Sequence, residues 1–212
     1  LLQKKKFHDV LRLGEKVDNK QRSYLFFDIM GTAYVGTGQI KLAISSFYKS
    51  IYLNKQFIPS YVNLGKAMTK IKNFKSAEQA FNKALQLNNS ETQALIGKGL
   101  IKVKQGLLRE AAKFYEASLQ IKLDRFAVRT LAAIYTNLWE DKKDFKDLLR
   151  AKELLEKDFF AFPNDAGTTL HHLSGLMTRM SFIKFSEKDY SLILAILRQD
   201  PTSIIKMENA IK

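Results

Sequence analysis

The chain has 212 residues, of which 46% are hydrophobic and 26% are charged, and its formal net charge is +14. A chain of this length and composition can bury a substantial core, which excludes a disordered tail. It contains no cysteine, so a disulfide scaffold, thiol chemistry and a cysteine zinc site are also excluded. The positive charge favours acidic partners, but it says nothing about the fold.

The first nine residues, LLQKKKFHD, lack the apolar core and the small-residue cleavage site of a signal peptide. No apolar run approaches the roughly 18–20 residues that a membrane span needs. The chain begins with leucine, so we expect the natural N-terminus, with any targeting signal, to lie upstream. The compartment and the organism stay open at this point, and an intracellular location is expected.

Three columns of residues recur with a spacing of 34, one of glycine, one of alanine and one of aromatic residues. The columns are Gly31, Gly65 and Gly99; Ala43, Ala77 and Ala111; and Phe47, Phe81 and Tyr115. Because apolar residues between them recur with helical spacing, each period predicts a hairpin of two helices. Glycine inside a helix costs about 1 kcal/mol relative to alanine, so we expect each glycine to seat the aromatic ring of its own hairpin.

In chain order, residues 1–20 predict the end of one helix followed by a second helix, which is half a repeat. Three complete hairpins follow within 24–123. Their helices are expected at 24–36 and 40–53, at 59–71 and 75–87, and at 92–104 and 108–121. Gly38 and Gly106 fall at the turns of the first and third hairpins.

The rest of the chain departs from the period. Residues 124–165 predict an irregular fourth hairpin in which about seven residues, DKKDFKD at 141–147, are inserted. We expect this insertion to be too polar for burial and to extend the hairpin beyond its neighbours. Residues 166–212 predict a divergent hairpin, with helices at 166–180 and 187–198, and a capping helix at 201–211. The whole of 1–212 is thus expected to form a single array.

The period, the three columns and the turn glycines resemble the tetratricopeptide repeat family, most clearly over 24–123. The resemblance implies an all-α fold, a right-handed superhelical solenoid of antiparallel helix hairpins. It also implies a concave groove, lined by the first helix of each hairpin, that binds a segment of another protein. The groove residues that we select with its help are Asp28, Thr32, Val62, Asn63, Lys66, Lys70, Ile96, Leu100, Val103, Lys104 and Arg129.

One subclass of the family grips the C-terminal carboxylate of heat-shock chaperones. Of the residues that make this clamp, only Asn63 has a match here, so such a ligand is not expected. Four cations of the selected set, Lys66, Lys70, Lys104 and Arg129, are expected on one wall of the groove, beside apolar positions. This combination favours a partner segment with acidic and hydrophobic residues.

The sequence offers little to support catalysis. Residues 31–36 imitate the start of a phosphate-binding loop, but Thr37 stands in place of the lysine and no strand precedes it. His171 and His172 would point about 100° apart on a helix, so they cannot share one metal ion without help. We therefore expect a protein-interaction scaffold and not an enzyme, with no catalytic residue, cofactor, metal or membrane span.

Two alternatives stay open. One is the recognition arm of a larger transferase-type enzyme whose catalytic domain lies outside this chain. The other is a basic RNA-binding helical repeat, although the lysines are spread over nearly every helix and few aromatic residues lie among them. The sequence does not indicate the oligomeric state.

Overall fold

The structure is a computed structural model that describes residues 2–162, 169, 171–172 and 175–176. All regular structure in this part of the chain is helical. The helices are α1 (Leu2–Glu15), the short 3-10 helix η1 (Asn19–Gln21), α2 (Tyr24–Thr37), α3 (Ile40–Leu53), α4 (Ile58–Lys70), α5 (Phe74–Leu87), α6 (Thr92–Lys104), α7 (Leu108–Ile121), α8 (Arg125–Lys142) and α9 (Phe145–Ala161). The six helices predicted over 24–123 begin and end within one residue of their expected bounds, and the all-α hairpin fold is confirmed.

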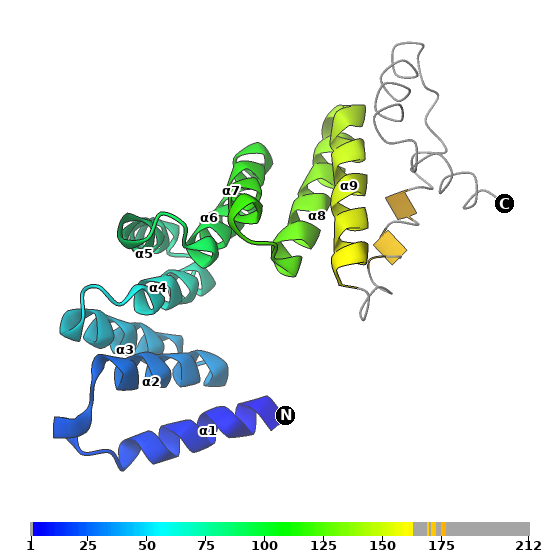
Figure 1. Cartoon of the computed structure of the whole chain (residues 1–212). Helices are drawn as coiled ribbons and strands as arrows, with labels where there is room; N and C mark the ends of the chain where they lie inside the picture. Colours follow the sequence, from blue (N-terminus) through cyan, green and yellow to red (C-terminus); the bar gives the residue numbers. More distant parts are fainter. Residues whose placement is uncertain (1, 163–168, 170, 173–174, 177–212) are drawn as a thin grey trace, which may run out of the picture. The chain divides into compact units, whose positions relative to one another are not determined.

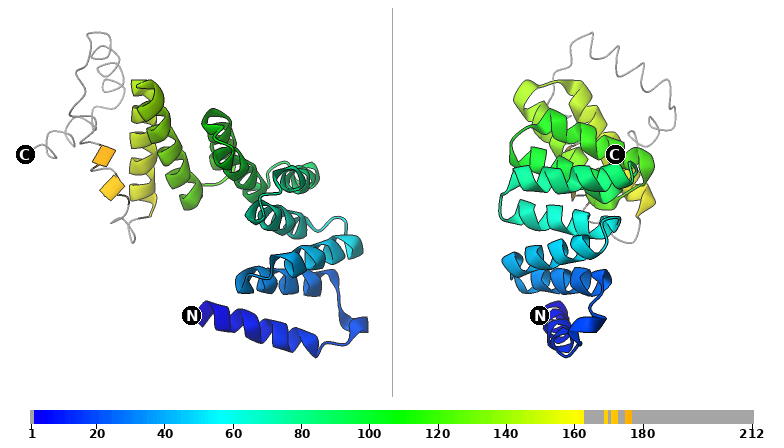
Figure 2. Two further views of the ribbon diagram at one scale, coloured as in Figure 1. Left: turned by 180° about the vertical axis from the view of Figure 1, so that it is seen from behind. Right: turned by 90° about the vertical axis from the view of Figure 1, so that its left-hand side faces the viewer.

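The chain divides into two compact units, Leu1–Ile134 and Tyr135–Lys212. In the first unit, α2 pairs with α3, α4 with α5 and α6 with α7, and these hairpins stack in chain order (Figures 1 and 2). The stack is held where α3 packs on α4 and where α5 packs on α6. We call the contacts of the first hairpin with α4 the first junction, and those of the second hairpin with α6 the second junction.

The segment before the first hairpin forms one continuous helix, α1, which packs on α2. The expected break between the end of one helix and a second helix is therefore absent from residues 2–15. The reason is local, because the run Lys4–Lys6 consists of good helix formers and no turn residue precedes Gly14. Phe7 lies directly against the backbone of Gly36, which fixes α1 to α2.

Each glycine of the repeating column seats the ring of its own hairpin, as predicted. A Cβ atom built on Gly31 would lie 2.5 Å from Phe47, and one on Gly65 would lie 2.6 Å from Phe81. The corresponding distance from Gly99 to Tyr115 is 2.8 Å. These approaches are too close for a real side chain, so only glycine lets the paired helices meet around a buried ring.

The three hairpins also turn in the same way. In each, the first helix ends in a Schellman motif, in which two backbone amides beyond the helix donate to carbonyls of its last turn. The bond that spans five residues runs from Gln39 N to Tyr34 O, from Asn73 N to Met68 O and from Leu107 N to Lys102 O, at 2.8, 3.0 and 2.9 Å. The residue before each donor has a positive φ, and it is Gly38, Lys72 and Gly106 in turn.

The segment at 141–147 differs from the expected polar insertion. α8 continues to Lys142, and Asp144 caps α9 by accepting a hydrogen bond of 3.0 Å from Lys146 N. Phe145 and Asp147 are only 7% and 4% exposed, so the expectation that this segment is too polar for burial is wrong for these two residues. The physical reason is that Phe145 and Leu148 share one apolar face of α9 at helical spacing and pack together in the core of the second unit.

The additional residues lengthen the two helices, since α8 has 18 residues and α9 has 17, against 13 or 14 in the preceding hairpins. The hairpin expected at 166–198 and the capping helix at 201–211 lie outside the described residues, apart from 169, 171–172 and 175–176. Among the described residues, no helix has the length and the apolar character that a bilayer crossing needs. The division of the array into units remains a prediction.

Candidate functional site

A pocket of about 630 Å³ lies on the first unit, in the size range of sites for small molecules or peptide side chains. It is lined by Lys66, Thr69, Lys70, Lys72, Phe81, Gln93, Ile96, Gly97, Leu100, Lys104, Asp124 and Phe126. These residues come from α4, its turn, α5, α6 and the start of α8, so the pocket spans the second junction. Its walls combine apolar side chains with four lysines.

The pocket lysines give the site an excess of positive charge. Lys66 and Lys70 are four residues apart on α4, Lys72 follows in the turn, and Lys104 ends α6. All four lysines are exposed to solvent. Asp124 is the one acidic residue among the lining residues. Cations gathered over apolar walls focus a positive potential, which attracts anionic groups.

Lys66 connects the two sides of the pocket. Its Nζ donates a hydrogen bond of 2.9 Å to Gln93 Oε1, which ties α4 to α6. Desolvation lowers the pKa of Lys66 below its ordinary value, against the opposing attraction of Glu91 and Asp124. Its ammonium group has therefore lost part of its hydration, and a bound anion would favour the charged form again.

The apolar part of the pocket is formed around the ring of Phe81. This ring is fully buried, Ile96 is 6% exposed, and Phe126 remains 55% exposed at the start of α8. Phe81 contacts Gly65 of its own hairpin and Gly97 of the next. Gly97 lies outside the glycine column, so the 34-residue period alone did not indicate its role.

The structure brings together five of the eleven residues selected from the sequence: Lys66, Lys70, Ile96, Leu100 and Lys104. Val62 instead belongs to the core, at 5% exposed, and Val103 is half-buried outside the pocket lining. Arg129 does not line the pocket either, and the fourth cation is Lys72. Sequence reasoning missed Lys72, although it occupies the repeat position of the turn glycines.

Asp28 and Asn63 hold the first junction together. Asp28 Oδ1 accepts hydrogen bonds from Ser60 Oγ at 2.8 Å and from Asn63 Nδ2 at 3.1 Å. The Ser60 hydroxyl also lies 2.7 Å from Ser50 Oγ, and Ser50 in turn donates to the carbonyl of Tyr24. Both serines are fully buried, so these groups form a polar chain inside the array. Thr32 is exposed, and its hydroxyl donates to the carbonyl of Asp28.

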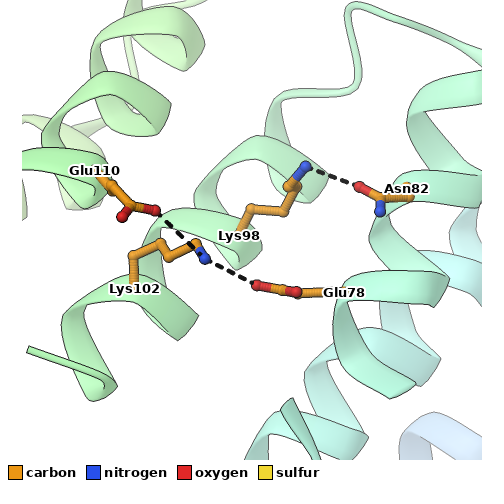
Figure 3. Close-up of polar contacts among 5 residues, drawn as sticks. All are labelled: Glu78, Asn82, Lys98, Lys102 and Glu110. Atoms are coloured by element: carbon orange, nitrogen blue, oxygen red, sulfur yellow. Dashed lines mark hydrogen bonds and ion pairs between the residues drawn. The ribbon is translucent and has the colours of Figure 1, made fainter. Parts of the chain in front are cut away.

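The two other lysines of α6, Lys98 and Lys102, contact side chains of neighbouring helices. Lys102 pairs with Glu78 at 3.3 Å and with Glu110 at 3.4 Å, and these contacts join α5, α6 and α7 (Figure 3). Lys98 donates to Asn82 and lies 4.8 Å from the ring centroid of Phe114. The hydrogen bond with Glu78 is the largest cause of a raised pKa at Lys102. These lysines therefore stabilise contacts within the third hairpin and between it and the second.

The described residues contain no group of three or more acidic, histidine or cysteine side chains that could hold a metal ion. His171 and His172 are both exposed, with ring centroids 6.1 Å apart. The arrangement at the pocket is suited to binding through charge and apolar contact.

The chain is similar in sequence and in fold to known repeat proteins. A family model described as the tetratricopeptide repeat matches residues 28–57 and 58–91. The chain is also similar to a TPR repeat-containing protein, MJ1428 of Methanocaldococcus jannaschii, with 24% identity over 132 residues. The match covers 60% of this chain and only 21% of that protein, so the chain spans about a fifth of its relative's length.

Several solved structures are similar. The first TPR of Spaghetti (RPAP3), bound to the HSP90 peptide SRMEEVD, has 28% identity and a TM-score of 0.52, over 57% of this chain and 98% of that one. MamA has 25% identity and a TM-score of 0.60, over 71% and 90% of the two chains. TTC0263 of Thermus thermophilus has a TM-score of 0.62 over 81% and 99%, but at 14% identity this likeness shows the fold alone.

Proposed function

The chain belongs to the tetratricopeptide repeat family, and on that premise we propose that it is an interaction scaffold for an acidic and hydrophobic segment of another protein. The observation that supports this proposal is the pocket at the second junction. There, Lys66, Lys70, Lys72 and Lys104 surround apolar walls and face a single carboxylate among the lining residues.

The chemistry of the pocket favours two kinds of side chain in the ligand. Carboxylates would pair with the lysines, and each exposed pair contributes about 0.2–1 kcal/mol. Apolar side chains would cover Leu100 and Phe126, with a gain of about 25 cal/mol for each Å² of apolar surface removed from water. Neither contribution alone is large, so the proposed ligand combines both.

The similar RPAP3 structure supports a peptide ligand of this composition. Its peptide, SRMEEVD, contains three acidic residues beside methionine and valine. In this chain, Asn63 is the single match to the carboxylate clamp, and it donates to Asp28. We therefore propose that this chain recognises acidic side chains within a segment, and not a C-terminal carboxylate.

The selected residues take different roles under this proposal. Lys66, Lys70, Ile96, Leu100 and Lys104 contact the partner, and Thr32, Val103 and Arg129 extend the same surface. Asp28, Val62 and Asn63 position the helices that carry it, since their contacts lie within the array.

A displayed library of random twelve-residue peptides, each joined at its C-terminus to the phage coat, tests the proposal without offering a free C-terminal carboxylate. We expect selection on the wild-type chain to enrich peptides in which Asp or Glu neighbours Leu, Ile, Phe or Met. Changing Lys66, Lys70 and Lys104 together to Glu should weaken binding of these peptides at least tenfold, as the loss of about 1.4 kcal/mol implies.

The matched control changes Lys49, Lys83 and Lys113 together to Glu. These lysines are exposed on the second helices of the hairpins, and the change alters the net charge by the same amount. We expect the control to slow association and to keep most of the affinity. If no acidic peptide is enriched, or if both triple variants lose affinity equally, the proposed function is overturned. Preferential binding of a random RNA oligonucleotide at the same salt would favour the RNA-binding alternative instead.

A further inference from the structure

The turn between α4 and α5 contains a lysine where the turns on either side contain glycine. Gly38, Lys72 and Gly106 are each 34 residues apart, with φ angles of 85°, 61° and 77°. All three complete the same Schellman motif. A positive φ is free of strain for glycine, whereas it is unfavourable for a residue that has a Cβ atom. The second hairpin thus tolerates strain that its neighbours avoid.

Local contacts do not explain this lysine. Asparagine and aspartate are the residues other than glycine that most readily adopt such a conformation. Among the described residues, the side chain of Lys72 makes no hydrogen bond or ion pair, and the residue is exposed. Lys72 does, however, line the pocket at the second junction.

The position of Lys72 also adds a second unfavourable contribution. It places a fourth cation beside Lys66, Lys70 and Lys104, with Asp124 as the one acid in the lining. Like charges gathered at one site repel each other in the unbound protein, and this repulsion is relieved when an anionic ligand is present. Backbone strain held at a site of this kind points to a function for the residue that bears it.

We propose that Lys72 is a specificity-determining residue, which selects ligands with neighbouring acidic residues and is retained although it destabilises its own turn. The inference rests on the proposed function, because it assigns a role within the same pocket. Neighbouring carboxylates match the site better than a single one, since the lining has an excess of three positive charges.

The test uses three variants of the full chain. Lys72→Gly removes both the strain and the charge, and Lys72→Gln removes the charge while the strained backbone remains. Gly38→Lys is the matched control, because it introduces a lysine with positive φ into a turn that does not line the pocket. Stability is measured as the urea midpoint, and binding as the fluorescence anisotropy of a labelled synthetic copy of the most enriched library peptide.

We expect Lys72→Gly to raise the urea midpoint and to weaken peptide binding about three- to tenfold. Lys72→Gln should weaken binding equally with a smaller rise of the midpoint, and Gly38→Lys should lower the midpoint with unchanged affinity. A peptide in which acidic residues are separated by three or more others should be insensitive to Lys72→Gly.

Unchanged affinity in Lys72→Gly, with normal binding by the wild type, would overturn the role of Lys72 and leave the proposed function intact. A lower urea midpoint for Lys72→Gly would also overturn the inference, because the lysine would then not destabilise its turn. If the wild-type chain enriches no acidic peptide at all, the proposed function fails, and the inference fails with it.

Discussion

The first and second junctions use different chemistry at equivalent positions of the repeat. At the first junction, the half-buried Asp28 and the fully buried Ser50 and Ser60 form a hydrogen-bonded chain. The residues 34 positions later are Val62, Ala84 and Ala94, which are at most 5% exposed and apolar. The repeat therefore determines where two hairpins meet, while the residues between its columns determine how they are held together.

The second junction compensates for its missing hydrogen bonds by close packing. Gly97 is the counterpart of Asn63, and where Asn63 donates to Asp28, Gly97 lies against the ring of Phe81. The polar pairs of the second junction lie at its surface, as in the contact between Lys102 and Glu78. The comparison suggests that packing contributes most at the second junction and buried hydrogen bonds contribute most at the first.

The largest effect is expected from Gly97→Leu. Any side chain at this position meets the buried ring of Phe81, so the variant forces the two hairpins apart. We expect it to destabilise the chain by about 3 kcal/mol, measured by urea unfolding, and Gly65→Leu to act similarly. Lys75→Ala, at an exposed position in the first turn of α5, is the control and should change stability by less than about 0.5 kcal/mol. Equal midpoints for Gly97→Leu and the control would contradict the packing account.

A smaller loss is expected from Ser60→Ala. The variant leaves Asp28 without one of its donors and Ser50 without a buried neighbour, at a cost of about 1–3 kcal/mol. Combining it with Ser50→Ala and Asp28→Val reproduces the residues of the second junction. We expect the triple variant to recover most of the loss, because replacing a whole polar group by apolar residues removes the unsatisfied partners. A triple variant less stable than Ser60→Ala would show that the two junctions are not interchangeable.

Tyr115→Phe extends the comparison to the ring of the third hairpin. The Tyr115 hydroxyl is buried and has no hydrogen-bond partner among the described residues, so we expect its removal to stabilise the chain by about 1 kcal/mol at pH 7. Desolvation raises the pKa of Tyr115 to about 12. Since the unfolded value is about 10, Tyr115 ionises in the unfolded chain before it does so in the folded chain, so the stability of the wild type is unaffected below pH 10 and falls as the pH rises toward 12.

The wild-type chain should accordingly lose about 2 kcal/mol more than Tyr115→Phe between pH 9 and pH 12, measured as urea midpoints at several pH values. Phe47 and Phe81 occupy the same column without a hydroxyl, so the variant makes the third hairpin equivalent to the other two. Parallel pH profiles for the two chains would argue against a buried, unpaired hydroxyl.

The smallest effect is expected from Lys102→Met, which removes the surface pairs with Glu78 and Glu110. Because these pairs lie at the surface, where solvent screens the charges, we expect a loss of about 0.5 kcal/mol or less at pH 7 and low salt. The pKa of Lys102 is raised, so its contribution is complete below the unfolded value of about 10.4 and is lost as the pH rises through the folded value. A loss that persists in 1 M salt would indicate packing by the lysine stem instead.

The parts of the fold that depend on the period were predictable from the sequence. The bounds of α2 to α7 and the fit of Gly31 against Phe47 follow from columns that repeat every 34 residues. The contact of Gly97 with Phe81 did not follow, since it joins two hairpins and one of its residues lies outside the columns. The positive φ of Lys72 could not be predicted for another reason, because lysine, unlike glycine, does not indicate a turn with positive φ.

The site was predictable only in part for a similar reason. Lys66, Lys70 and Lys104 could be aligned from helical spacing and the repeat, and the structure places them at one pocket. Asp28 was also selected as a groove residue from the repeat frame, but its hydrogen bonds with Ser60 and Asn63 depend on the distance between neighbouring hairpins. Side-chain contacts of this kind cannot be derived from the spacing within one helix.

The ring of Phe81 has a consequence for the way the array unfolds. It belongs to α5, yet one of its contacts lies on Gly97 of the following hairpin. Its packing energy is therefore a coupling between neighbouring repeats, which in a linear array governs whether units open singly or together. Strong coupling at this position makes local opening of α6 expose part of the preceding hairpin as well. The backbone amides of α4 and α6 should then exchange with deuterium in one cooperative event, so the pocket is formed or lost as a whole.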